Sequence, residues 1–101
     1  MRARVVAILK EAASEFINRE SNRSSMITVT GVALDRRGGQ ANIFVSVFPE
    51  KNTHAATDFL NRQTDAFHMY LKKHTRLARL PRVRFLADPV IGGTIEEVGE
   101  T

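Results

Sequence analysis

The sequence predicts a small α+β domain in which helices cover one face of a three-stranded sheet. Apolar residues recur at helical spacing near the start of the chain, alternate along two stretches joined by a glycine turn, and alternate again after a long helical region. The predicted order is helix, strand, strand, helix, helix, strand, which fits a two-layer sandwich. A chain of 101 residues has room for one modest core, so we expect a single domain over residues 1–101.

The first helix is expected over residues 3–19. Val5, Leu9, Ala12 and Phe16 recur at helical spacing, and polar residues fall mostly on the opposite side. A run of polar, turn-prone residues follows and ends this helix. Charged residues interrupt the apolar positions, so the stretch is expected to be an amphipathic helix and not a signal peptide.

The next two stretches are expected to form a β-hairpin. Apolar residues alternate with threonines from Ile27, and after Gly31 their positions shift by one residue, which indicates a bulge at this glycine. The sequence RRGG at 36–39 predicts the turn, because glycine supplies the positive φ of tight turns. Apolar residues lie on both faces of the returning strand, with Phe44 and Phe48 on the second. Two interpretations stay open: the strand is covered on both sides, or the second face is open and these two rings could stack on bases.

Residues 50–80 form the longest helical stretch of the sequence. Polar residues at 63–65 interrupt its apolar stripe, so we expect two helices with a kink between them. Thr64 or Asp65 is expected to cap the second helix. Pro81 ends the unit, because the residue before a proline is disfavoured in helical conformation.

The alternating sequence RVRFLAD, residues 82–88, predicts the third strand. A right-handed crossover through the two helices would place this strand parallel to the second one. Residues 89–101 are rich in glycine and are expected to form a mostly irregular tail.

Positive charge is concentrated in one segment of the chain. Of 15 Lys and Arg residues, six fall close together with no acidic residue among them, namely Lys72, Lys73, Arg76, Arg79, Arg82 and Arg84. The remaining nine cations face eleven Asp and Glu residues, so the rest of the chain is slightly acidic. Such segregation is typical of a surface that binds a polyanion.

A structural explanation of these cations competes with phosphate binding. Lys and Arg near the C-terminus of a helix oppose its dipole, each by roughly 0.3–1 kcal/mol. This reason does not extend to Arg82 and Arg84, which lie on the predicted strand, and a solubilising surface normally mixes in acidic residues. Arginine also binds phosphate in a bidentate manner, so we favour RNA or DNA phosphate as the ligand.

The sequence contains few features that indicate an active site. His54, His68 and His74 do not have the spacing of metal ligands, no phosphate-binding loop is present, and the chain has no cysteine. We therefore expect no enzymatic activity, no cofactor and no small-molecule substrate. No apolar run approaches the roughly 18 residues that span a bilayer, so no membrane association is expected.

Three segments in order resemble the ribosome-binding factor A family: RVVAILKEAASEFI, ITVTGVALDRRGGQANIFVSVF and LKKHTRLARLPRVRFLAD. The last segment matches the family's leucine–arginine pattern, proline and apolar strand. The resemblance covers about residues 4–98 and implies a type II KH-like fold. In this fold a kinked helix pair replaces the Gly-x-x-Gly loop with which typical KH domains hold nucleic acid, and here Thr64-Asp65-Ala66 stands where the family has an Ala-x-Gly kink.

The resemblance also implies a function. Such a protein would be a non-catalytic, cytoplasmic and monomeric factor that binds the small ribosomal subunit near the 3′ end of its ribosomal RNA during late maturation. The six cations would then hold that RNA by its phosphates. The residues alone leave two alternatives open: a sequence-tolerant RNA-binding module or RNA chaperone not tied to the ribosome, and a protein–protein adaptor that uses an exposed edge of the first or third strand.

Overall fold

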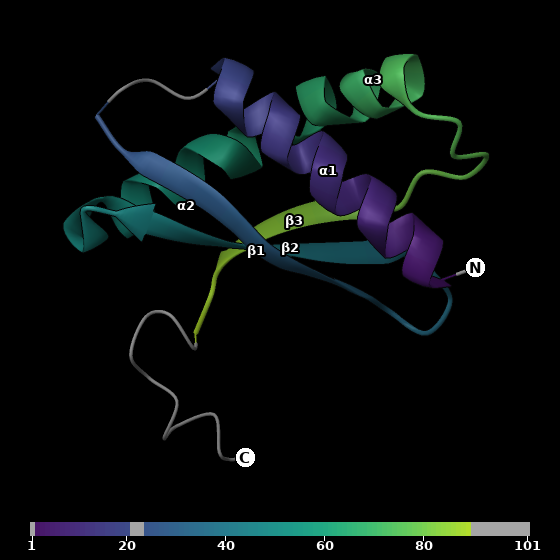
Figure 1. Cartoon of the computed structure of the whole chain (residues 1–101), viewed down its shortest axis with the longest axis horizontal. Coiled ribbons are helices and arrows are strands. Elements are labelled where there is room, and N and C mark those ends of the chain that lie inside the picture. Colours follow the sequence, from purple (N-terminus) through teal and green to yellow (C-terminus); the bar gives the residue numbers. More distant parts are fainter. Residues whose placement is uncertain (1, 21–23, 90–101) are drawn as a thin grey trace.

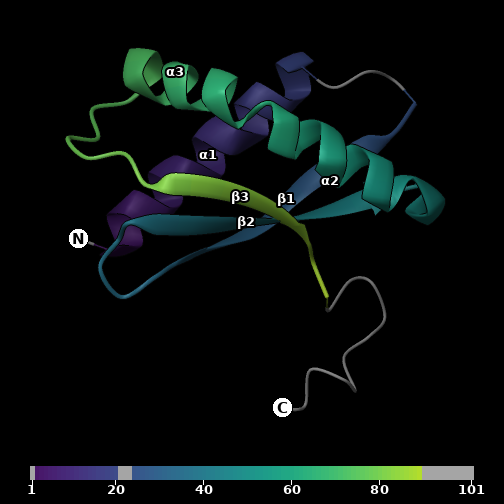
Figure 2. The same ribbon diagram turned by 180° about the vertical axis from the view of Figure 1, so that it is seen from behind.

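The structure is a computed structural model that describes residues 2–20 and 24–89. It has two layers, with all three α-helices on one side of a three-stranded sheet (Figure 1 and Figure 2). The expected α+β sandwich and its order of elements are confirmed. The elements are α1 (Arg2–Glu20), β1 (Met26–Leu34), β2 (Gln40–Phe48), η1 (Glu50–Asn52), α2 (Thr53–Arg62), α3 (Thr64–His74) and β3 (Arg82–Ala87). Most of the predicted tail, residues 90–101, lies outside the described residues.

Helix α1 covers the sheet with one apolar side. Leu9, Ala13 and Ile17 are fully or almost fully buried, and Phe16 is 3% exposed. The helical spacing of these residues explains why a single face carries them all. Polar and charged residues occupy the solvent side, as the sequence predicted.

The bulge expected at Gly31 is confirmed. Strands β1 and β2 pair antiparallel, and their register shifts between Val29 and Gly31. The extra residue, Thr30, donates a hydrogen bond from its hydroxyl to the Phe44 carbonyl at 3.2 Å. Because one residue is added, the apolar residues before and after the bulge, Val29 and Val32, both lie on the helical side of the sheet.

Asp35 fixes the turn between β1 and β2. Its carbonyl accepts a hydrogen bond from the Gly38 amide at 3.1 Å, and its Oδ1 accepts one from the Gly39 amide at 2.8 Å. Gly38 has φ +72°, a conformation that side chains with a Cβ rarely adopt. The glycine pair therefore makes the turn that the sequence predicted at these positions.

Strand β3 pairs in parallel with β2, as the crossover argument predicted. Ile43 of β2 lies opposite Phe85 of β3, and both are fully buried. Phe85 meets the ring of Phe67 from α3 at 5.7 Å between centroids, and Phe67 meets Phe16 of α1 at 5.1 Å. The centre of the core is thus an aromatic cluster that joins α1, α3 and β3.

The two helices of the long helical stretch meet at Gln63, which confirms the predicted kink. Gln63 has φ −101° and ψ 12°, and its amide donates to the Leu60 carbonyl at 2.9 Å. The expectation that Thr64 or Asp65 caps α3 is wrong. Gln63 holds the cap position without a side-chain hydrogen bond, and the Thr64 hydroxyl donates back to the Asn61 carbonyl at 3.4 Å.

The described residues do not cover both faces of β2 equally. Ala41, Ile43 and Val45 are fully buried under the helices, whereas Phe48 is 74% exposed and Phe44 is half-buried. All described helices lie on the other side of the sheet (Figure 2). The periodicity placed these rings on the second face, but it could not tell whether anything packs there.

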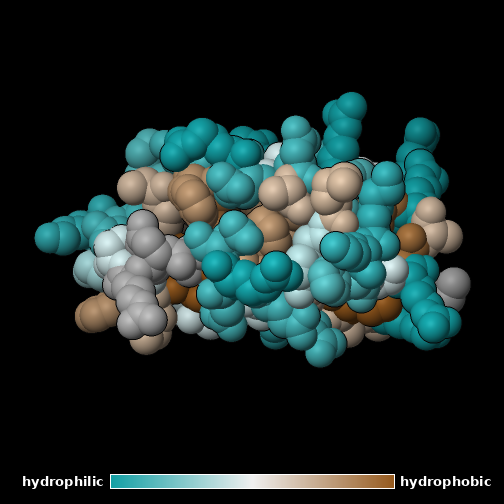
Figure 3. All heavy atoms as spheres, turned by 90° about the horizontal axis from the view of Figure 1, so that it is seen from above, coloured by the Kyte–Doolittle hydropathy of each residue, from teal (hydrophilic) through white to brown (hydrophobic). Residues whose placement is uncertain are grey.

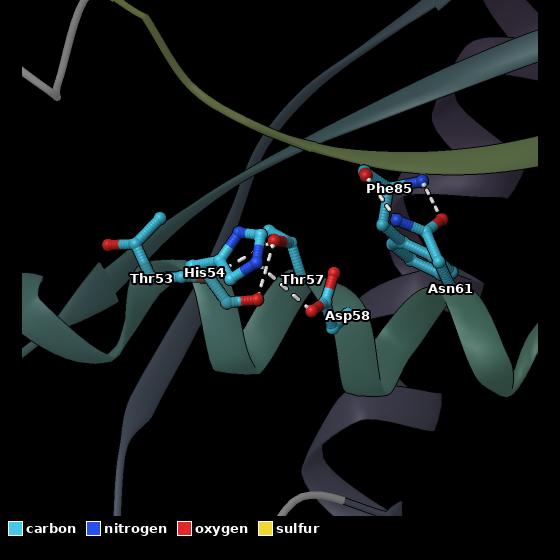
Figure 4. Close-up of polar contacts among 6 residues, drawn as sticks. All are labelled: Thr53, His54, Thr57, Asp58, Asn61 and Phe85. Atoms are coloured by element: carbon cyan, nitrogen blue, oxygen red, sulfur yellow. Dashed lines mark hydrogen bonds and ion pairs between the residues drawn. The ribbon is translucent and has the colours of Figure 1, made fainter.

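Asn61 occupies the free edge of β3. Its side-chain amide donates to the Phe85 carbonyl at 2.9 Å and accepts from the Phe85 amide at 2.8 Å, so it pairs with the strand as a neighbouring strand would (Figure 4). An unpaired strand edge is a template for association with another chain. The Asn61 side chain blocks this edge at its centre.

We predict that Phe67→Ala lowers the free energy of unfolding by about 3–5 kcal/mol, because the substitution leaves a cavity between three elements. Denaturant unfolding followed by circular dichroism measures the change. Phe48→Ala is the matched control, and its 74% exposure predicts a change of no more than about 0.5 kcal/mol. Equal stability of the two variants would contradict the central position of Phe67.

A second prediction concerns the edge of β3. Asn61→Asp keeps the acceptor for the Phe85 amide but sets a carboxylate oxygen against the Phe85 carbonyl, so the variant should lose about 1–2 kcal/mol of stability. Denaturant unfolding and hydrogen exchange of the Phe85 amide measure this effect. Unchanged stability together with unchanged exchange would show that water replaces the side chain without cost.

Candidate nucleic-acid interface

The six cations of the segment 72–84 lie in three structural settings. The first is the last turn of α3, where Lys72 and Lys73 are both exposed. The helix ends at Thr75, whose amide and hydroxyl both donate to the Leu71 carbonyl, at 3.0 and 2.7 Å. Leu71 is fully buried, so the position of both lysines is tied to the core.

The second setting is the connection between α3 and β3. Leu77 and Leu80 pack against the core, and Pro81 is fully buried. Arg76 directly precedes Leu77, Arg79 directly precedes Leu80, and both arginines are exposed. The alternation of leucine and arginine in the sequence therefore holds this connection on the core while it directs both guanidinium groups to solvent.

The third setting is β3 itself. Val83 and Phe85 face the helices, so the alternation of the strand directs Arg82 and Arg84 to the opposite side of the sheet, where both are exposed. Arg82 lies opposite Gln40 of β2, and Arg84 lies opposite Asn42. The fold thus divides the six residues between the helical layer, the connection and the outward face of the sheet. The sequence had suggested one continuous surface.

None of the six cations forms an ion pair within residues 2–20 and 24–89. The ion pair found there joins His54 and Asp58 on successive turns of α2, with 3.2 Å between Nε2 and Oδ2 (Figure 4). Both side chains are more than half exposed, so this pair contributes little to stability. The six cations are available to an external anion, and the dipole of α3 accounts for only Lys72 and Lys73.

Arg19 extends the cationic surface at the helical end and His74 lies beside it, and the sequence alone assigned neither residue to the site. The Cζ atom of Arg19 in α1 lies 5.5 Å from the centroid of the Tyr70 ring. The centroid of the His74 ring lies 4.2 Å from that of Tyr70. With Lys72 and Lys73 these residues line a hollow of about 580 Å³ between α1 and α3. Figure 3 looks onto this helical side, where hydrophobic residues show between hydrophilic ones. Arg19 is distant in sequence, so no local pattern pointed to it.

Tyr70 is held firmly in this hollow. Its hydroxyl donates to Oε1 of Glu15 at 2.9 Å, and its ring meets Phe16 edge to face at 5.6 Å. Partial burial, and after it the hydrogen bond to Glu15, raises the pKa of Tyr70 above its ordinary value. The side chain is therefore neutral and fixed at physiological pH, with its ring between the Arg19 and His74 groups.

Acidic residues of α1 lie in the surroundings of Arg76, just as Glu20 of α1 lines the hollow of Lys72 and Lys73. Together with Glu11 and Glu15 of α1, Arg76 lines a second hollow, of about 360 Å³. Carboxylates near a guanidinium group compete with a phosphate for it. Arg79, Arg82 and Arg84 have no acidic neighbour of this kind among the hollows found in residues 2–20 and 24–89.

The junction of α2 and α3 lacks the chemistry of a nucleic-acid loop. It contains no glycine that would let a ligand approach the backbone, and Asp65 adds an exposed negative charge in the first turn of α3. The arrangement supports only a structural role for this junction. Within the described parts of the chain no cluster of His, Cys, Asp or Glu could hold a metal ion. None of the helices there could span a membrane.

These features define a KH-like domain: an α+β sandwich in which a broken helix pair links an antiparallel hairpin to a parallel third strand. The sequence model of the family described as "Ribosome-binding factor A" matches residues 1–96. The chain therefore belongs to the ribosome-binding factor A family. No curated protein sequence matches the chain at a significant level.

Solved structures agree with this assignment. The crystal structure of ribosome-binding factor A from Thermus thermophilus is 30% identical, with a TM-score of 0.77 over 86% of this chain and 94% of that one. A Thermus thermophilus homology model of the factor, fitted into the cryo-EM map of a 30S–RbfA complex, is 29% identical, with a TM-score of 0.70 over 83% and 91%. A putative ribosome binding factor A from Thermotoga maritima, solved by NMR, shares the fold at 22% identity, with a TM-score of 0.68 over 83% of each chain.

Proposed function

We propose that this protein is a non-catalytic assembly factor that binds the RNA of the small ribosomal subunit during late maturation of that subunit. One observation carries the proposal: a member of the ribosome-binding factor A family exposes six cations between residues 72 and 84. None of them is ion-paired within residues 2–20 and 24–89. The similar Thermus thermophilus factor, fitted into a 30S complex, supports the small subunit as the partner.

In this proposal the whole chain acts as one RNA-binding domain and works as a monomer in the cytoplasm. Phosphates of the RNA pair with Lys72 and Lys73 on the helical side and with Arg79, Arg82 and Arg84 beyond it. The junction of α2 and α3 contributes shape and no direct contact, because it offers neither glycine nor positive charge. The blocked centre of the β3 edge makes an adaptor that adds a strand at β3 the weaker interpretation, and leaves the edge of β1 as the place for such an adaptor.

We predict that replacing Arg76, Arg79 and Arg82 with glutamine weakens binding to small-subunit RNA while the melting temperature barely changes. All three side chains are exposed, so the fold does not depend on them. Each lost phosphate contact should also flatten the slope of log affinity against log salt by about 0.7–0.9. Filter binding at several salt concentrations measures both effects.

The matched control replaces Lys10, Lys51 and Arg62 with glutamine, which removes the same charge from exposed positions elsewhere. It should keep most of the affinity and most of the salt slope. Equal losses in the two triple variants would show that net charge alone drives binding. In cell extracts the wild type should sediment with free small subunits. Sedimentation with mixed RNA would instead support an RNA chaperone.

A further prediction separates the helix junction from the cationic segment. Asp65→Asn should leave the affinity for small-subunit RNA within about twofold, apart from the small gain of removing one negative charge near a polyanion. Lys73→Gln should weaken binding more than this, with little change in melting. If Asp65→Asn abolishes binding by a folded protein, the junction contacts the RNA and the assignment of the site is wrong.

A further inference from the structure

The outward face of the sheet carries a combination of residues that the phosphate contacts do not explain. Among the described residues, the helices all lie on the other side of the sheet (Figure 1 and Figure 2). Strand alternation directs aromatic, cationic and amide side chains to this face, and none of the outward residues of β1, β2 and β3 is acidic. The outward-facing residues that could contact a ligand on this face are Asn42, Phe44, Phe48, Arg82, Arg84 and Leu86.

Phe44 lies at the middle of this face. Its neighbour on β3 is Leu86, but its neighbour on β1 is Gly31, the glycine of the bulge. Apart from its chain neighbours, no atom lies within 4 Å of the place where a Cβ of Gly31 would be. No side chain therefore lies directly opposite Phe44 on β1, although Phe44 itself is half-buried.

Phe48 lies further along the same strand and is still more accessible. It is 74% exposed, and its partner across the sheet, Met26, is 69% exposed. Both residues line a hollow of about 540 Å³, to which Thr28 and Ser46 of the same face also contribute. Two large apolar side chains with such exposure are costly in water unless a ligand covers them.

The positive charge lies at the opposite end of the face. Arg84 neighbours Asn42, which is two residues from Phe44 and therefore about 7 Å from it along β2. Glu50 and Asp88 border the hollow at the Phe48 end, and Asp35 lies in the turn beside Gln40, whose neighbour on β3 is Arg82. A bound polyanion would thus place its phosphates near the arginines, and its less charged groups near the aromatic rings.

We propose that the outward face of the sheet binds unpaired nucleotides of RNA, with bases stacked on Phe44 and Phe48 and phosphates held by Arg82 and Arg84. This inference rests on the proposed RNA binding and names the form of RNA that this face takes. Unpaired bases can stack on aromatic side chains of an open sheet, whereas bases inside a duplex cannot reach them. The adjacency of arginine and aromatic residues, without an acidic residue among the strands, favours RNA over an apolar protein surface.

The test compares an unpaired RNA oligonucleotide with the duplex that it forms with its complement. Phe48→Ala and Phe44→Leu should each lose at least about fivefold in affinity for the unpaired strand, the effect of one lost stack of about 1 kcal/mol. Their affinity for the duplex should stay within about twofold, because phosphate contacts remain. His54→Ala is the control, since the His54 ring is 89% exposed on α2, outside the hollows described above, and should matter for neither RNA.

A second measurement does not depend on truncating a ring. The chain has no tryptophan, so Phe48→Trp introduces a single reporter on this face. Its fluorescence should be quenched by the unpaired strand and much less by the duplex. Wild-type affinity of both Phe variants for the unpaired strand, or equal quenching by both RNAs, overturns the inference.

The outcomes also separate this inference from the proposed function. If Arg82→Gln with Arg84→Gln weakens binding to both RNAs while the Phe variants bind both normally, phosphate binding stands and base stacking is refuted. If the wild type binds neither RNA, both proposals fail. If Phe48→Ala changes the sedimentation mass of the protein but not its RNA affinity, the face joins two copies of the chain and the inference is refuted.

Discussion

The contact of Phe67 with Phe16 and Phe85 is the interaction on which the rest of the structure depends. The three rings come from α3, α1 and β3, with centroids 5.1 and 5.7 Å from that of Phe67. Buried aromatic rings contribute large areas and specific geometry, so this cluster fixes how the helices lie on the sheet. The end of α3 and the start of β3 then have defined positions, and the cationic segment runs between them.

Apolar anchors, and not ion pairs, position the charged residues. Leu77, Leu80 and Pro81 hold the connection on the core, and Arg76 and Arg79 beside them remain exposed without an ion pair in the described part of the chain. An exposed cation without a partner adds little to stability. This exposure supports the proposal that the cluster is a surface for a polyanion.

The bulge at Gly31 links the core to the opposite face of the sheet. One added residue keeps Val29 and Val32 on the helical side, which the core requires. The same bulge places a glycine directly opposite Phe44 on β1. A single local feature thus completes the core on one face and removes the side chain opposite an aromatic residue on the other.

The sequence by itself determined the helices, the strands, the bulge and the helix break, because local periodicity, glycine and proline dictate these features. The tertiary structure alone decided four others: the exposure of Phe48, the division of the six cations between two sides of the sheet, the approach of Arg19 to Tyr70, and the pairing of Asn61 with Phe85. Each of these depends on contacts between residues far apart in the chain. A periodic pattern shows which residues share a face of one element, but only packing between elements decides which faces are covered.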